Sequence, residues 1–169
     1  WLLLQNEIND LPLALALCQG AGARLAFNLA PVDGREADYE LGCVDLLIVN
    51  EIEARALVPA DIAAGDDAVV AGWLAQKYPG MDVVLTAGAA GLLHAQGESV
   101  QHHPAFPVNA VDETAAGDAF IGYLLAGLLA GADMTQALRL GAAVGARAVT
   151  VAGAASSIPD PEAVQSLLA

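Results

Sequence analysis

The sequence predicts an α/β protein built on a parallel β-sheet. Short apolar runs alternate with longer helical segments along the 169 residues, which is typical of β-α-β units with right-handed crossovers. One run, residues 45–49, is almost continuously apolar, as expected of a strand buried on both faces of a parallel sheet. In such sheets ligands bind beyond the carboxyl ends of the strands. The segments that directly follow the strands are therefore the first candidates for a functional site.

The first half of the chain supplies the strand–helix alternation. The helix over residues 11–20 is expected to end at Gly20, because glycine tolerates the left-handed conformation that closes helices. The helix over residues 66–78 places Ala71 and Leu74 on one face. We expect strands over residues 2–5, 24–29, 45–49 and 82–86, and helices over residues 11–20, 51–57 and 66–78.

The second half predicts a hairpin and then mainly helices. Residues 91–94 and 99–102 form the hairpin, with its turn around Gln96 and Gly97. The uncharged run 119–132 falls short of the roughly 20 residues that a membrane span needs, so a buried helix is the better interpretation. We expect helices over residues 117–131, 134–150 and 161–168.

Charge and cysteine usage limit the classes of function. The chain has 20 acidic and 6 basic residues, for a net charge of −14. Nucleic acids and anionic membranes are recognised through Lys and Arg, so neither is expected as a partner. Cys18 and Cys43 lie in unrelated apolar segments, which indicates free thiols in a reducing cytoplasm. We therefore expect a cytoplasmic protein, and the charge says little more about its function.

Residues 111–120 change from a turn of small residues to a long apolar helix, with Asp118 at the junction. Ala115, Ala116 and Gly117 have almost no side chain, so a ligand can approach their backbone closely. The start of a helix has N–H groups without partners and carries the positive end of the helix dipole, and both favour an anion. An anion site beside a carboxylate suits phosphoryl transfer to a hydroxyl. The alternative is that Asp118 only caps the helix, a position that aspartate favours.

Four stretches of the sequence resemble the ribokinase-like carbohydrate kinases of the phosphofructokinase-B type, in the family's order. They are residues 49–54 (VNEIEA), 85–91 (LTAGAAG), 112–120 (DETAAGDAF) and 149–159 (VTVAGAASSIP). The resemblance implies a three-layer, Rossmann-like parallel sheet of the ribokinase-like fold. Members of this family begin well before the point that corresponds to Trp1. We therefore expect residues 1–169 to be the C-terminal ATP-binding and catalytic part of a single ribokinase-like domain, with the N-terminal part and the lid missing.

The resemblance also implies catalytic roles. Asp118 corresponds to the base that takes the proton from the sugar hydroxyl as this hydroxyl attacks the γ-phosphate. Ala115, Ala116 and Gly117 correspond to an anion hole that holds the transferring phosphoryl group through backbone N–H groups.

Further residues correspond to the family's ATP site. Asn50 and Glu53 would order Mg²⁺ and its waters; the alternative is a capping box at the start of a helix. The residues lining the ATP phosphates and ribose would be Thr86, Ala87, Gly88, Ala89, Ala90 and Gly91, together with Gly117 and Asp118. For residues 86–91 the alternative is an ordinary glycine turn after a strand. Ala142 corresponds to a position near the adenine.

A monovalent cation site is the last implied feature. A potassium ion beside the anion hole would be held by a set of carbonyl groups and one carboxylate. The corresponding residues are Asp112, Thr114, Ala148, Val151, Gly153 and Ser157. The alternative for Asp112 is a simple turn residue.

The sequence thus leads to a specific expectation of function. It is ATP-dependent phosphorylation of a sugar hydroxyl, with ribose as the first candidate sugar and with Mg²⁺ and K⁺ as cofactors. The alternatives are a catalytically silent nucleotide-binding or structural fragment, or a kinase of another small substrate such as fructose or a nucleoside. The apolar sheet edge at residues 2–4 is open to pairing with another chain, so we expect a homodimer, with a swapped assembly or aggregation as the alternatives. We also expect these residues to be inactive as a kinase when they are isolated from the sugar pocket.

Overall fold

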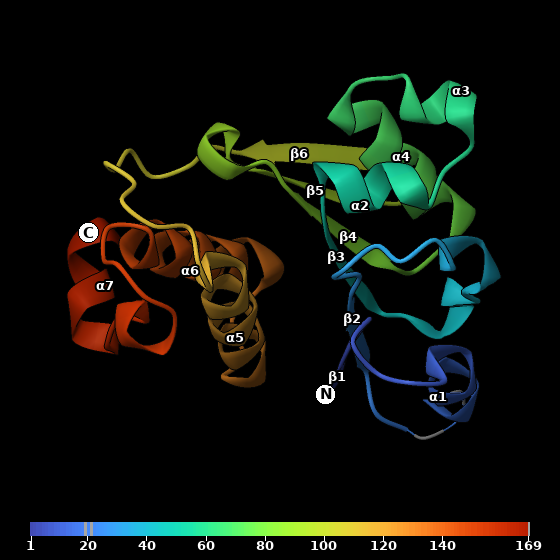
Figure 1. The fold of residues 1–169 in the computed structure, drawn as a ribbon, viewed down its shortest axis with the longest axis horizontal. Helices are drawn as coiled ribbons and strands as arrows, with labels where there is room; N and C mark the ends of the chain where they lie inside the picture. Colours follow the sequence, from blue (N-terminus) through green and yellow to red (C-terminus); the bar gives the residue numbers. More distant parts are fainter. Residues whose placement is uncertain (19, 21, 169) are drawn as a thin grey trace. The chain divides into compact units, whose positions relative to one another are not determined.

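The computed structural model describes residues 1–18, 20 and 22–168, which form two compact units. The first unit consists of Trp1–Ala87 and Leu92–His103, and the second of Gly88–Gly91 and Pro104–Ala169. Each unit has its own set of packed elements, shown in Figure 1. The expectation of a single domain stays a prediction.

The first unit contains one six-stranded sheet in the order β1-β2-β3-β4-β5-β6. Its strands are β1 (Leu2–Gln5), β2 (Leu25–Asn28), β3 (Leu46–Asn50), β4 (Asp82–Thr86), β5 (Leu92–Gln96) and β6 (Ser99–His103). Strands β1 to β4 pair in parallel, whereas β5 and β6 add an antiparallel hairpin. The prediction of a mostly parallel α/β sheet is confirmed.

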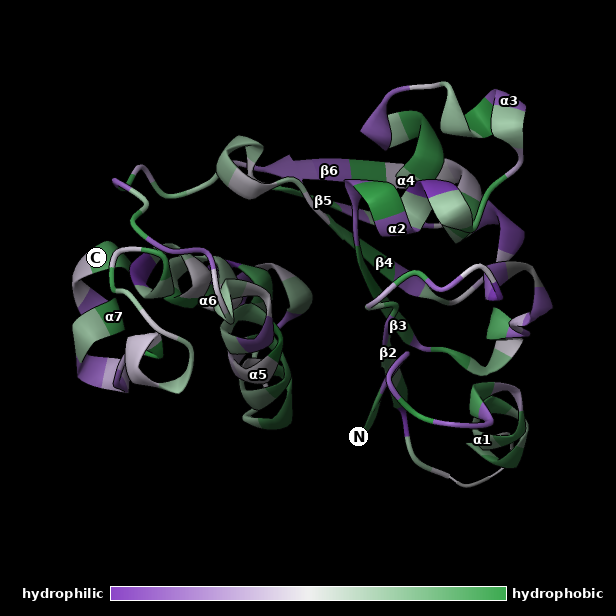
Figure 2. Ribbon diagram, viewed as in Figure 1, coloured by the Kyte–Doolittle hydropathy of each residue, from purple (hydrophilic) through white to green (hydrophobic). Residues whose placement is uncertain are grey.

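Helices α1, α2 and α4 cover one face of this sheet (Figure 1). Phe27, Leu47, Val83 and Ala95 are successive cross-strand partners, and all four belong to the core under these helices. The β3 and β4 ribbons are hydrophobic along most of their length (Figure 2), as strands with both faces buried should be. The helices and 3₁₀ turns of this unit are α1 (Leu11–Cys18), η1 (Glu36–Asp38), η2 (Leu41–Cys43), α2 (Glu51–Ala56), α3 (Ala60–Ala63) and α4 (Asp67–Lys77).

The second unit is helical and is organised around two closely packed helices, α5 and α6. A Cβ atom at Gly141 would lie 2.9 Å from the backbone oxygen of Phe120, and one at Gly127 would lie 3.3 Å from Ala137. Glycine at these two positions therefore lets the two backbones approach each other. The elements of this unit are η3 (Gly88–Ala90), α5 (Ala116–Leu129), α6 (Met134–Ala148), η4 (Ala155–Ser157) and α7 (Pro161–Leu168).

The predicted strands and helices are confirmed, with most ends shifted by one or two residues. The expected end of the first helix falls partly on Gln19, which lies outside the described residues. Helix α3 and the 3₁₀ turns are not predicted, because segments of three or four residues show no hydrophobic period. Within residues 1–18, 20 and 22–168, no helix combines the length and apolar composition needed to cross a bilayer.

Candidate functional site

The first group of site residues lies at the carboxyl edge of the sheet, within the first unit. Asn50 ends β3 and Thr86 ends β4, and the two residues are register partners. The Thr86 hydroxyl donates a hydrogen bond to the Val49 carbonyl oxygen at 3.3 Å. In this arrangement Thr86 offers a ligand an acceptor and not a donor. The sheet thus brings two of the predicted ATP-site residues side by side.

Asn50 and Glu53 form a complete capping box at the start of α2. The Asn50 side-chain oxygen accepts from the N–H groups of Ile52 and Glu53, both at 2.9 Å. One carboxylate oxygen of Glu53 accepts from the Asn50 N–H and the other from its side-chain amide, both at 2.8 Å. The capping-box alternative is therefore confirmed as local structure, and it leaves the proposed role toward Mg²⁺ open.

The Glu53 carboxyl group is buried without a charged partner. Its residue is 8% exposed, and no Lys, Arg or His among the described residues forms an ion pair with it. Burial raises the pKa of Glu53, and the hydrogen bond from the Asn50 N–H partly opposes this effect. A buried carboxylate that lacks a counter-charge is suited to a cation or to the waters around one.

Residues 86–91 follow β4 as a turn of small residues. Gly88–Ala90 form the 3₁₀ turn η3, and Gly88 and Gly91 have φ values of +51° and +98°. The Gly91 N–H donates to the Gly88 carbonyl at 3.1 Å. Ala87 is half-buried, whereas Gly88, Ala89 and Ala90 are exposed. This backbone is accessible to a ligand and carries no charged side chain.

The second group of site residues surrounds the start of α5. Ala115 is the N-cap and has φ +61°, a left-handed conformation that is unusual for alanine. Asp118 is the third residue of the helix and is exposed. The alternative that Asp118 caps the helix is therefore wrong, because the cap position belongs to Ala115.

The backbone N–H groups at this helix start are only partly satisfied. The Ala116 N–H donates to the Glu113 carbonyl at 3.2 Å. In the part of the chain that the structure describes, no acceptor pairs with the N–H groups of Ala115, Gly117 or Asp118. Of the three residues predicted for the anion hole, Ala115 and Gly117 have free N–H groups, whereas the N–H group of Ala116 is already paired. The N–H group of Asp118, which is not part of the prediction, is also free. Three free donors beside a carboxylate form a place for an anion.

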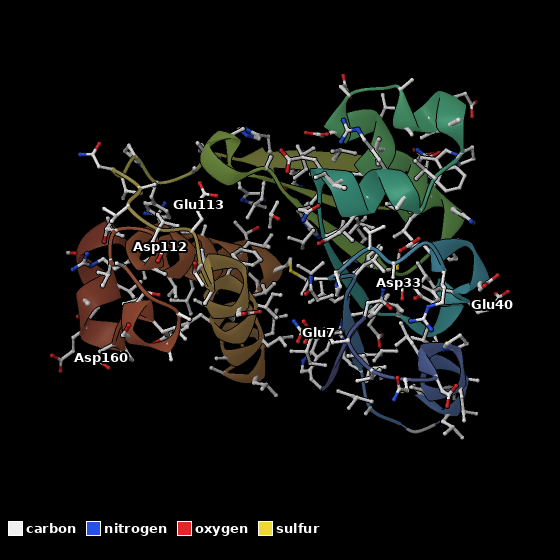
Figure 3. The ribbon with its side chains drawn as sticks, in the orientation of Figure 1. Glu7, Asp33, Glu40, Asp112, Glu113 and Asp160 are labelled. Atoms are coloured by element: carbon white, nitrogen blue, oxygen red, sulfur yellow. The ribbon has the colours of Figure 1, made fainter. Side chains whose placement is uncertain are left out.

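Asp112, which is labelled in Figure 3, lies in the segment before α5 and accepts a hydrogen bond from the loop after α6. One of its carboxylate oxygens accepts from the Thr114 hydroxyl at 2.6 Å and the Thr114 N–H at 3.0 Å; the other accepts from the Gly153 N–H at 2.8 Å. These donors lower the pKa of Asp112 to about 2, with the Thr114 hydroxyl as the largest cause. Asp112 is therefore more than a turn residue, since it holds two loops together.

The remaining predicted cation-site residues line the end of α6 and the loop after it. The Ala148 carbonyl accepts from the Val151 N–H at 3.1 Å, and the buried Ser157 hydroxyl donates to Ala154. No three acidic, His or Cys side chains among the described residues gather closely enough to hold a metal ion. A monovalent cation here would depend on carbonyl oxygens, as the resemblance implies.

Ala142 lies within α6, half-buried between the buried residues Gly141 and Ala143.

The structure places the predicted site residues in two groups, one in each unit. The carboxyl edge of the sheet holds Asn50, Glu53, Thr86 and Ala87, whereas the second unit holds Gly88 to Gly91, the start of α5 and the Asp112 loops.

Two features of these groups are missing from the sequence-based prediction. One is the free N–H group of Asp118, which follows from the unexpected cap at Ala115. The other is Asn28, a buried residue at the end of β2 whose amide donates to the Ile48 carbonyl at 3.1 Å. A polar residue at the end of an apolar strand is the signal that would have drawn attention to Asn28.

The family model of the pfkB family carbohydrate kinases matches residues 11–161 of this chain. The chain therefore belongs to the pfkB family of carbohydrate kinases. The ribokinase of Haemophilus influenzae is 32% identical over 92% of this chain and 51% of its own length. The 2-dehydro-3-deoxygalactonokinase of Haloferax volcanii is 35% identical over 88% of this chain and 48% of its own length.

Solved ribokinase structures have the same fold. That of Thermotoga maritima matches with a TM-score of 0.80 and 33% identity, over 98% of this chain and 55% of its own. The ribokinase of Cryptococcus neoformans in complex with ADP gives 0.84 and 27%, over 97% and 60%. That of Arabidopsis thaliana complexed with ribose and ATP gives 0.81 and 25%, over 98% and 55%. The chain spans about half the length of the curated relatives it matches.

Proposed function

We propose that this chain is the nucleotide-binding and catalytic part of an ATP-dependent sugar kinase of the ribokinase type. The observation that carries the proposal is the start of α5, where the free N–H groups of Ala115, Gly117 and Asp118 lie beside the exposed Asp118 side chain. Membership of the pfkB carbohydrate kinase family supports the same reaction class.

In this proposal Asp118 is the general base. The sugar hydroxyl oxygen attacks the γ-phosphorus, the bond from this phosphorus to the ADP oxygen breaks, and the hydroxyl proton passes to the Asp118 carboxylate. The N–H groups of Ala115, Gly117 and Asp118 stabilise the charge on the transferring phosphoryl oxygens. The exposure of Asp118 is consistent with a base that must reach a substrate.

The same proposal assigns ATP and Mg²⁺ to the two groups of site residues. Mg²⁺, when bound, neutralises charge on the phosphates. Glu53, a buried carboxylate without a counter-charge, would hold the cation's waters, and Asn50 fixes the carboxylate through two hydrogen bonds. The backbone of residues 88–91, which is exposed at Gly88, Ala89 and Ala90, would contact the phosphates and ribose, with Ala142 near the adenine. A related ribokinase structure holds ADP, and another holds ribose and ATP.

We also propose a monovalent cation, K⁺, held by carbonyl groups around Asp112 and Gly153. The hydrogen bonds of Asp112 to Thr114 and Gly153 support this assignment, because they join the two loops that would surround the ion. Such an ion would stiffen the segment that leads into the anion hole.

Ribose is the first candidate substrate, since two of the related ribokinases are matched over more than nine-tenths of this chain. The second candidate function is a catalytically silent nucleotide-binding fragment.

The test uses the complete product of the gene that encodes this chain, incubated with MgATP and, one at a time, ribose, fructose, 2-dehydro-3-deoxygalactonate and a nucleoside. Phosphorus NMR should show ADP and one sugar phosphate forming in equal amounts, with ribose fastest. Nucleotide binding without transfer to any of these acceptors would establish the silent-fragment alternative instead. Transfer to the nucleoside alone would keep the kinase reaction and reject the sugar.

A further inference from the structure

Each of the four parallel strands ends on an uncharged polar residue: Gln5, Asn28, Asn50 and Thr86. Two of them lie on either side of β3 and donate hydrogen bonds to it. The Asn28 amide donates to the Ile48 carbonyl at 3.1 Å, and the Thr86 hydroxyl donates to the Val49 carbonyl at 3.3 Å. Consecutive carbonyl groups of β3 are thus held from both neighbouring strands, directly before Asn50.

The Asn28 side chain is fixed in this orientation. It is 7% exposed, and its oxygen accepts from the Gln5 side-chain amide at 3.1 Å, so its NH₂ group must face Ile48. The Ile48 carbonyl already accepts from the Leu29 N–H at 3.3 Å. The Asn28 amide is therefore not needed to satisfy this carbonyl. An apolar side chain of similar size would avoid the cost of burying an amide.

Strand β3 ends at Asn50, the residue directly after these two carbonyl groups, and α2 begins at Glu51. The Asn50 N–H donates to the carboxylate of Glu53, in the first turn of α2, at 2.8 Å. The direction in which β3 ends therefore sets the direction of α2 and of the Glu53 carboxylate. Hydrogen bonds from the strands on both sides of β3 restrict the direction of its end more than hydrogen bonds from one side alone would.

We propose that Asn28 and Thr86 form a clamp on the end of β3 and act as positioning residues for the Asn50–Glu53 box. Its consequence for catalysis rests on the proposed function, because the box is assigned there to Mg²⁺. The effect of the clamp on the structure of the box does not rest on the proposed function, because the clamp is present in the chain without any ligand.

The first test measures hydrogen exchange by NMR in the chain without ligands, at the three amides of the box: Asn50, Ile52 and Glu53. The variants Asn28→Leu and Thr86→Val should each speed their exchange by about five- to tenfold, and Thr86→Ser should restore protection. The matched control is Thr150→Val, since the half-buried Thr150 hydroxyl also donates to a backbone carbonyl, that of Arg147 at 2.7 Å. Thr150→Val should leave hydrogen exchange at the three amides of the box unchanged.

Unchanged exchange at these amides in Asn28→Leu and Thr86→Val would overturn the clamp. If Asn28→Leu does not fold, Thr86→Val with its serine rescue decides the matter, because Thr86 is only half-buried.

The second test measures ADP affinity with Mg²⁺ and with EDTA. Asn28→Leu should weaken binding of ADP about fivefold with Mg²⁺ and leave it unchanged in EDTA, because the box is expected to act through the cation. An equal effect in both conditions would reject the positioning role. A wild-type chain that shows no effect of Mg²⁺ on ADP binding would reject the proposed function of the box, while the exchange result still decides the clamp.

Discussion

At Gly117 the need for a small residue can be assigned to function and not to folding. Apart from its chain neighbours and the backbone of its own helix, a Cβ atom added there would meet no atom within 4 Å, so packing does not demand glycine at this position. The neighbouring Ala115 has φ +61°, which puts a non-glycine residue in an unfavourable conformation at the same helix start. Small residues at this point therefore keep open the space in front of the helix, where a phosphoryl group is proposed to lie.

Replacing Gly117 by alanine should leave the fold intact and impair the reaction. Alanine inside a helix is more stable than glycine by about 0.5–1 kcal/mol, so the melting temperature should stay equal or rise. Turnover in the complete gene product should fall roughly 10²-fold, the size of effect expected from one lost anion-hole contact.

Gly122→Ala is the matched control for that variant. Gly122 lies in the same helix and is exposed, and a Cβ there also meets nothing within 4 Å. It should gain the same stability without loss of turnover. Full activity in Gly117→Ala would show that no ligand approaches this part of the backbone.

At the scale of the element, α2 combines a local capping motif with a buried charge. Burial raises the pKa of Glu53 above its ordinary value of 4.5. The unfolded chain therefore ionises first as the pH rises. The stability associated with this group is complete below about pH 4.5 and is lost as the pH rises through the folded-state pKa.

Glu53→Gln should remove this loss and keep the hydrogen bond from the N-cap N–H, because the glutamine oxygen also accepts there. The second hydrogen bond, from the Asn50 side-chain amide, is lost at every pH, because glutamine has an NH₂ group in place of that oxygen. Melting temperatures between about pH 4 and pH 8 should therefore show that the stability of the variant relative to the wild type increases with pH. Glu51→Gln, in the first turn of the same helix, reports the effect of net charge alone. A variant that is clearly less stable at pH 8 than at pH 4, relative to the wild type, would contradict the assignment.

Elements were predictable wherever the determining signal is local in the sequence. The sequence predicts the Asn50–Glu53 capping box as an alternative because two residues three positions apart specify it directly, and short apolar runs predict the strands. The sequence does not predict the cap at Ala115, because a left-handed backbone and not a capping side chain defines it. The clamp at Asn28 depends on cross-strand register, which the sequence of one strand does not contain.

At the scale of the whole molecule, the site residues fall into two compact units. The sheet edge with Asn50 and Glu53 belongs to the first unit, and the start of α5 belongs to the second. The chain belongs to the pfkB carbohydrate kinases and spans about half the length of its curated relatives. The choice of ribose, the expected homodimer and the inactivity of the isolated chain stay predictions.

The most direct test of the account is the Asp118→Ala variant of the complete gene product, with turnover and ADP affinity measured on the same preparation. Loss of a general base should lower turnover by about 10²- to 10⁴-fold, and ADP should bind as tightly as in the wild type. Equal turnover in variant and wild type would contradict the claim that the start of α5 carries out phosphoryl transfer.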